Sequence, residues 1–315
     1  MNSENWVKQF LKYCDEDNIK PWKFDFKRFY TDDENKSSSV ELWLKYRLNE
    51  LDEPKLDNSI NQKLKDVFLY LHQNNQQKDP DKVGFPIYKV LDWQKESTDV
   101  VRGDSMNSFK TTFTKDIISS EDYKRVYKQV GIDTSKFLYE QYGILLKDKN
   151  YLRFKIIKDN KIEIERFARL THSIGNFTVL PYKINTTRGT SKDFRDYWDI
   201  TLKVIYDLFM SIGDEGISAW KAFIKKYYLQ PFVKHDDTYY VGELWLQHFN
   251  KSVYPIEDED FKQFYHNVNL LIEERGKWIA KQLCDKLNLQ DLSFYKELEG
   301  MKEIKFFDEL EGIIK

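Results

Sequence analysis

The amino-acid sequence predicts an α+β fold that is predominantly α-helical and contains a small β-hairpin or sheet element. Three observations lead to this class. Apolar residues recur at helical spacing in most segments. Aromatic residues make up 16% of the chain, and their large rings can fill irregular spaces between helices. Only three short segments have an extended pattern. We predict one domain over residues 1–315, with the polar loop at 75–84 as its one candidate boundary.

Most of the predicted elements are helices, and the spacing of their apolar residues is the reason for each. The first helix has an apolar face made of Trp6, Val7, Phe10 and Leu11. Ser37 to Ser39 precede the second helix, where a serine hydroxyl can cap the first turn. In chain order, the predicted helices cover residues 5–14, 39–51, 59–74, 120–130, 134–146, 191–212, 216–228 and 257–287.

The three extended segments are short. Residues 85–93 are apolar and β-branched, which favours a strand. Residues 151–167 contain two alternating runs around Asp159 and Asn160, the pattern of a β-hairpin. Residues 175–181 predict a short strand or loop, and residues 99–113 are too irregular for a helix.

Charge and composition exclude several classes of protein. The chain has 50 basic and 52 acidic side chains, a balance that argues against a surface for extended nucleic acid but allows a local basic pocket. Cys14 and Cys284 match no metal-ligand spacing, so we expect reduced thiols and no metal site. The charged N-terminal residues do not form a signal peptide, and no apolar run is long enough for a membrane span. These features predict a cytoplasmic protein, and they indicate no particular cofactor.

A stretch at residues 166–200 differs from the rest of the chain, because it concentrates His, Asn, Arg and Asp. If a helix begins at residue 191 or 192, Phe194, Trp198, Leu202, Ile205, Phe209 and Ile212 form its apolar face. On the other face, Arg195, Asp196 and Asp199 occupy the first turns, where free N–H groups favour an anion. Arg188 and Arg195 can then clamp a phosphate or carboxylate. The alternative is that these arginines only pair with the neighbouring aspartates.

The same stretch holds a candidate acid or base. His172 precedes Gly175 and Asn176, which predict a turn with a positive φ angle. Asn185 follows in the next connection. The alternative for His172 is a hydrogen-bonded structural histidine.

A second polar cluster lies at residues 102–108, between apolar Val101 and Phe109. Loops with convergent polar groups between apolar anchors often carry function, although such a turn can also bond only to itself. We expect the two polar segments to lie against each other. The cluster consists of Arg102, Asp104, Ser105, Asn107 and Ser108.

The central motif resembles a family of uncharacterised bacterial proteins known only as a domain of unknown function. The matching positions are Gly175, Asn176, Pro181, Asn185, Arg188, Gly189, Asp196, Asp199, Thr201 and Leu202. Weaker matches flank the motif at Phe24 to Phe26, Ser37 to Ser39, Trp43 and Asp104 to Ser108, so the resemblance spans residues 24–210. The family has no established activity, and the resemblance therefore implies a site without naming its chemistry.

A looser similarity connects the Gly-Asn…Leu…Asn pattern to His-Me finger (HNH-type) nucleases. That chemistry needs a histidine base at the end of a strand, well upstream of the helix that bears the asparagine, and one divalent cation. The nearest histidine upstream of His172 is His72, in another predicted helix. The similarity therefore implies only a degenerate or divergent nuclease.

These residues predict a polar pocket for an anionic small molecule, a nucleotide or phosphate ester, with hydrolysis as a further expectation. The anion would be bound by Arg102, Arg188 and Arg195 and oriented by Asn107, Asn176 and Asn185. His172 would act with Asp104 or Asp196 as acid and base, and the lining would be completed by Ser105, Ser108 and Asp199. The alternative is a non-enzymatic interaction protein, for instance in phage defence or counter-defence, that binds a protein partner through Tyr227, Tyr228, Tyr239 and Tyr240.

Overall fold

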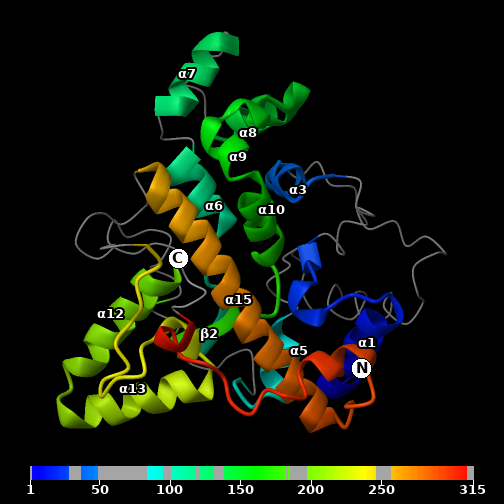
Figure 1. The fold of residues 1–315 in the computed structure, drawn as a ribbon, viewed down its shortest axis with the longest axis vertical. Coiled ribbons are helices and arrows are strands. Elements are labelled where there is room, and N and C mark those ends of the chain that lie inside the picture. The colour runs from blue at the N-terminus through cyan, green and yellow to red at the C-terminus, as the bar shows by residue number, and fades with distance from the viewer. Residues whose placement is uncertain are drawn as a thin grey trace.

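The computed structural model is predominantly helical, as the sequence predicts (Figure 1). It describes residues 2–27, 37–48, 84–94, 101–117, 121–130, 138–181, 184, 197–245 and 257–310. The predicted helix at 59–74 and most of the loop at 75–84 lie outside these residues. None of the described helices is both long and apolar enough to cross a membrane.

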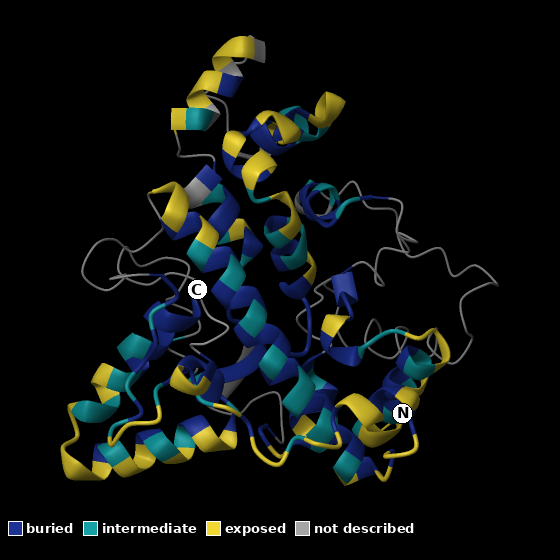
Figure 2. Ribbon diagram, viewed as in Figure 1, coloured by how far each residue is buried: buried dark blue, intermediate teal, exposed yellow. Residues whose placement is uncertain are grey.

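The longest helix, α15 (Asp258–Leu287), runs through the middle of the described structure (Figure 1). A capping box between Glu257 and Asp260 begins it, and Asn288 in the left-handed conformation ends it. Side chains on several faces of α15 are buried (Figure 2), which is typical of a central helix. It packs against α1 (Ser3–Glu16), the 3₁₀ turn η1 (Pro21–Lys23), α5 (Gly84–Val90) and α10 (Lys161–Leu170).

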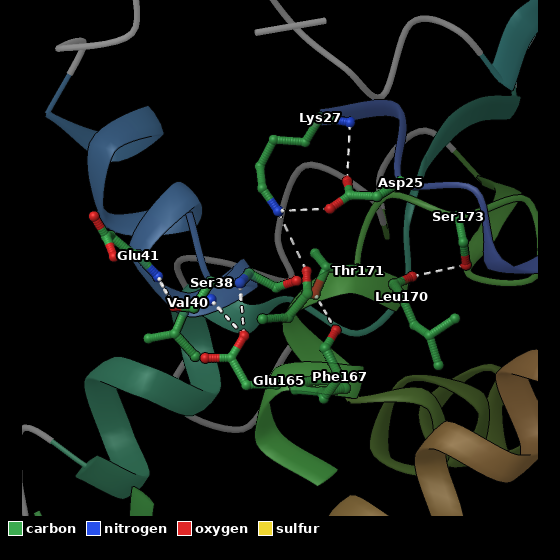
Figure 3. Close-up of polar contacts among 12 residues, drawn as sticks. Asp25, Lys27, Ser38, Val40, Glu41, Glu165, Phe167, Leu170, Thr171 and Ser173 are labelled. Atoms are coloured by element: carbon green, nitrogen blue, oxygen red, sulfur yellow. Dashed lines mark hydrogen bonds and ion pairs between the residues drawn. The ribbon is translucent and has the colours of Figure 1, made fainter. Parts of the chain in front are cut away.

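The N-terminal predictions are confirmed. Helix α1 buries Trp6, Val7, Phe10 and Leu11. Helix α3 (Ser39–Arg47) is capped by Ser38, whose Oγ accepts a hydrogen bond from Glu41 N at 3.1 Å. The Glu165 carboxylate from α10 accepts two further bonds, from Ser39 N at 2.6 Å and Val40 N at 3.2 Å (Figure 3). The helix start is thereby tied to α10.

Two strand predictions are wrong. Residues 151–167 are helical, forming the end of η4 (Lys147–Arg153), then α9 (Lys155–Asp159) and α10. The alternation misleads because Ile164, Phe167 and Ala168 also lie one helical turn apart, and all three are buried. Residues 85–93 form α5 and a following turn, in which Ile87 and Leu91 have the i, i+4 spacing of a buried helix face.

The small β element is one antiparallel pair. Strand β2 (Phe177–Pro181) was predicted, whereas its partner β1 (Val101–Ser105) lies in the segment that had no assigned structure. The register places Gly103 opposite Val179. Isolated strand pairs are only marginally stable in water, so the burial of Phe177, Val179 and Leu180 is what holds this one.

Helix α12 (Trp198–Met210) begins later than predicted, because Tyr197 has extended backbone angles (φ −116°, ψ 138°). Helix α13 (Asp214–Lys226) follows it closely. The predicted apolar face is buried at Trp198, Leu202 and Ile205, but Ile212 lies beyond the helix and is 63% exposed. The remaining helical elements are α6 (Phe109–Thr112), η3 (Phe113–Ile117), α7 (Glu121–Val130), α8 (Leu138–Leu146), η5 (Gln230–Phe232), η6 (Ser293–Glu297) and η7 (Asp308–Leu310).

Both cysteines are buried as free thiols. Burial raises the pKa of Cys14 and of Cys284 above the ordinary value for a thiol. Little reactive thiolate is therefore present near neutral pH.

Candidate functional site

The two polar segments singled out in the sequence lie against each other, as predicted. The antiparallel pairing joins residues 101–105 to residues 177–181. It continues beyond β1, because Met106 N donates to Asn176 O at 3.0 Å. Backbone bonds therefore fix the 102–108 segment to the turn that carries His172 and Asn176.

Asn107 and Asn176 form the centre of this junction. Asn176 Oδ1 accepts from Asn107 N at 3.0 Å, and Asn176 Nδ2 donates to the carbonyl oxygens of Asn107 and Thr171, both at 2.8 Å. Trp198 Nε1 donates to Asn176 Oδ1 at 3.0 Å, and Trp198 N donates to Asn107 Oδ1 at 2.9 Å. Asn107, Asn176 and Trp198 are all fully buried. The two amides align backbone segments, and the Asn176 amide bonds to Asn107, Thr171 and Trp198 inside the protein.

Two backbone N–H groups at the described start of α12 already have acceptors within the protein. The first N–H, on Trp198, is bonded to Asn107 Oδ1, and Ile200 N is bonded to Asp199 Oδ1 at 2.9 Å. Asp199 is only 1% exposed, and its Oδ2 accepts from Leu244 N at 3.1 Å. Asp199 was predicted in the first turn of the helix as a ligand-binding residue, and the structure buries it there beneath the segment around Leu244.

The His172 turn is also internal. His172 is buried, and its carbonyl oxygen accepts from Phe26 N at 3.1 Å. The positive φ angle predicted for this turn is absent, since neither Gly175 nor Asn176 has one. Gly175 is required for a different reason: a Cβ there would lie 2.0 Å from the carbonyl oxygen of Ile272 in α15.

The other predicted site residues divide into two groups. Ser105 is buried at the end of β1, and the half-buried Ser108 precedes α6, where its carbonyl oxygen accepts from Thr112 N at 3.2 Å. Arg102 and Asp104 have their backbones in β1, opposite Leu180 and Thr178. The side chains of Arg102 and Asp104, and the whole of Asn185, Arg188, Arg195 and Asp196, lie outside the described residues.

A buried ion pair beside the His172 turn was missed from the sequence. Lys27 Nζ lies 3.4 Å from Asp25 Oδ2 and 3.3 Å from the carbonyl oxygen of Ala168 (Figure 3). Both side chains are almost inaccessible to solvent. The signal in the sequence was the alternation of Phe24 and Phe26 with Asp25 and Lys27.

A second buried cation, Arg275, was also missed. Its guanidinium donates to the carbonyl oxygens of Gly175 and Phe177 at 2.7 and 2.8 Å. It also donates to those of Tyr227 and Tyr228 at 2.9 and 3.0 Å. Position 275 falls among charged residues in the sequence "LIEERGKW", where nothing distinguishes it from an exposed residue.

No His, Cys, Asp and Glu side chains gather into a group of three or more that could hold a metal ion within the described ranges. Comparisons with family models, curated proteins and solved structures find no match to this chain. The resemblances drawn from the central motif therefore remain predictions.

Proposed function

We propose that this protein binds an anionic small molecule, a nucleotide or phosphate ester, beside the junction of β1, β2 and α12. The supporting observation is the pairing that unites residues 101–106 with residues 176–181. Two polar segments far apart in the sequence become one unit, with Arg102 on β1 opposite Leu180 on β2. A rigid junction of this kind is the support that a binding site requires.

The geometry changes the roles proposed for individual residues. Asn107 and Asn176 bond to backbone and to Trp198, so their part is to align the elements and not to contact the ligand. In the proposal the anion is bound by Arg102, Arg188 and Arg195, since guanidinium groups bind phosphate oxygens through paired N–H donors.

The experiment is a thermal-shift screen with nucleotides and phosphate esters on the wild-type protein and on Arg102→Ala, Arg188→Ala and Arg195→Ala. An anion contact is not a packing contact. We therefore expect a ligand that raises the Tm of the wild type to lose this effect in at least one variant. Arg153→Ala is the matched control, because Arg153 is an exposed arginine at the end of η4.

A denaturant melt of the same variants separates binding from structure. If the arginines serve only as partners of buried aspartates, each alanine variant should lose about 3–5 kcal/mol of unfolding free energy. That loss, together with no ligand that shifts even the wild type, would contradict the proposal. If a ligand is found and turned over, His172→Ala should keep binding and lose turnover.

One observation favours the alternative of a non-enzymatic interaction protein, but it does not involve the predicted tyrosine surface. Tyr227 and Tyr239 are 5% and 8% exposed, so the four tyrosines do not form a surface patch. Leu208 near the end of α12 and Ile212 just beyond it are instead 52% and 63% exposed. Exposed large apolar side chains can mark a contact surface. A protein partner that is captured by pull-down or cross-linking with the wild type, and lost with Leu208→Ser and Ile212→Ser, would favour this alternative.

A further inference from the structure

Arg275 joins three separate segments through one side chain. Its Nη1 donates to the carbonyl oxygens of Gly175 and Phe177, in the turn before β2. Its Nη2 and Nε donate to Tyr227 O and Tyr228 O, just after α13. A planar guanidinium presents donors in a fixed fork, which a lysine cannot reproduce.

The charge of Arg275 is surrounded by neutral groups. The side chain is fully buried, and its guanidinium carbon lies 5.3 Å from the ring centroid of Trp93 and 5.1 Å from that of Trp198. Within the described part of the chain, no carboxylate lies within ion-pair distance of it. Burial without an acid lowers the pKa of the Arg275 guanidinium. Carbonyl dipoles and indole faces therefore offset the loss of water.

The turn that Arg275 holds is the one that carries Asn176. The carbonyl oxygens of Gly175 and Phe177 flank Asn176, so the guanidinium fixes the backbone on both sides of it. The Asn176 amide in turn binds the end of β1 at Asn107 and the indole of Trp198. Gly276, the next residue of α15, allows this approach, since a Cβ there would lie 3.4 Å from Gly175 Cα and 2.8 Å from Trp22 Cβ.

We infer that Arg275 is a positioning residue of the proposed site: its guanidinium fork fixes the Gly175–Phe177 turn and, through Asn176, aligns the end of β1 with the start of α12. This inference deepens the proposed function, because those elements frame the proposed anion contacts. Packing alone predicts lost stability and similar changes at the two indoles beside the guanidinium, Trp93 at 5.3 Å and Trp198 at 5.1 Å, when Arg275 is changed. A positioning role predicts in addition a larger change at Trp198, whose indole is hydrogen-bonded to Asn176 in the turn.

The test is a two-dimensional NMR spectrum of protein labelled with ¹⁵N-tryptophan. The chain has eight tryptophans, and Trp198→Phe identifies the Trp198 indole signal. Arg275→Lys keeps the charge and most of the volume but loses the fork. We expect it to shift or broaden the Trp198 indole signal while the signals of tryptophans far from the turn stay in place. A Trp198 signal that shifts no more than the Trp93 signal in Arg275→Lys would overturn the inference.

Chemical rescue separates the fork from the rest of the side chain. Arg275→Ala removes the guanidinium, and millimolar guanidinium chloride, well below the molar concentrations that unfold proteins, should restore the wild-type Trp198 signal. Ile279→Ala is the matched control: Ile279 is fully buried on the next turn of α15, and its variant should gain nothing from guanidinium. Failure of guanidinium to restore the signal in folded Arg275→Ala would contradict the role of the fork.

If Arg275→Ala does not fold, the spectrum of Arg275→Lys decides the question alone. None of these measurements uses a ligand. The absence of any ligand in the thermal-shift screen would therefore contradict the proposed function, while the part of the inference in which Arg275 fixes the Gly175–Phe177 turn would still stand. A Trp198 signal that shifts no more than the Trp93 signal in Arg275→Lys would contradict the role of Arg275 and leave the proposed function standing.

Discussion

Two buried cations contact the chain on either side of His172, and they are held in different ways. Lys27 binds the carbonyl oxygen of Ala168 before the turn and pairs with the carboxylate of Asp25. Arg275 binds carbonyl oxygens within the turn and after it, including Gly175 and Phe177, and two indole rings lie 5.1 and 5.3 Å from its guanidinium carbon. A compact ammonium is best matched by one opposite charge, whereas a planar guanidinium can be satisfied by several dipoles. The difference teaches that a buried charge need not form an ion pair, and that the two sites should respond differently to substitution.

The largest effect is expected at Trp198, which lies against the guanidinium of Arg275. Trp198 is fully buried and stacks on Phe232 with ring centroids 4.0 Å apart. Trp198→Ala should cost about 3–5 kcal/mol of unfolding free energy, because it leaves a large cavity. Urea unfolding followed by circular dichroism measures this cost. An unchanged midpoint would show that the indole does not support the Arg275 site.

Lys27→Met should cost a similar amount, about 3–5 kcal/mol, because it removes the ammonium that pairs with the buried Asp25 carboxylate. The double variant Asp25→Asn/Lys27→Met should recover most of that loss, since the amide oxygen can still accept from residue 27 N as Asp25 Oδ1 does at 3.0 Å. Urea midpoints of the two single variants and the double variant give the coupling free energy. Additive losses would mean that the pair is not coupled, and the contrast with Arg275 would then fail.

Asn176→Ala should have an intermediate effect on stability. It leaves Asn107 N and Trp198 Nε1 without their acceptor in a buried region, and each stranded group costs about 1–3 kcal/mol. Hydrogen exchange of the Asn107 amide and the Trp198 indole should accelerate in the variant more than exchange within α13. Equal acceleration everywhere would indicate a global loss of stability and no local role for the amide.

Lys203→Ala gives the smallest expected effect and the reference for a cation that is only partly buried. Lys203 Nζ pairs with Asp207 at 2.6 Å on α12, with the Lys203 and Asp207 side chains 26% and 58% exposed. Exposed pairs of this kind contribute less than about 1 kcal/mol. The thermal midpoint should barely move, and it should be less sensitive to salt than in the wild type. A loss of stability as large as that for Lys27→Met would show that burial does not explain why the two lysines contribute differently to stability.

Local patterns in the sequence predicted most of the helices because those helices bury one face. In α1, Trp6, Phe10 and Leu11 have the periodicity that the structure uses. The same rule failed at residues 151–167, where β-branched residues in alternation also satisfy a helical stripe that includes Ile164 and Phe167. Alternation over a short window does not distinguish the two structures when both faces contain some apolar residues.

The candidate site was located by composition, but the roles within it were not. The sequence indicated two polar segments, at residues 102–108 and 172–199, and the strand pairing joins residues 101–105 to residues 177–181. It could not show that Asn107 and Asn176 would bond to each other, because that depends on a contact between residues 69 positions apart. The burial of Asp199 was not predicted for a similar reason, since the Leu244 segment that covers it is distant in the chain. Arg275 had no local signal at all.

The position of α15 along the chain has a consequence for folding during synthesis. The Gly175 carbonyl oxygen gains its donor only after Arg275, 100 residues later, has been synthesised. The Asp15 carboxylate gains a donor later still, from the backbone N–H of Ser293. Because the ribosome releases the chain from the N-terminus, helices such as α1 and α10 emerge before the helix that covers their apolar faces. Until α15 emerges, those faces remain open to chaperones and to other nascent chains.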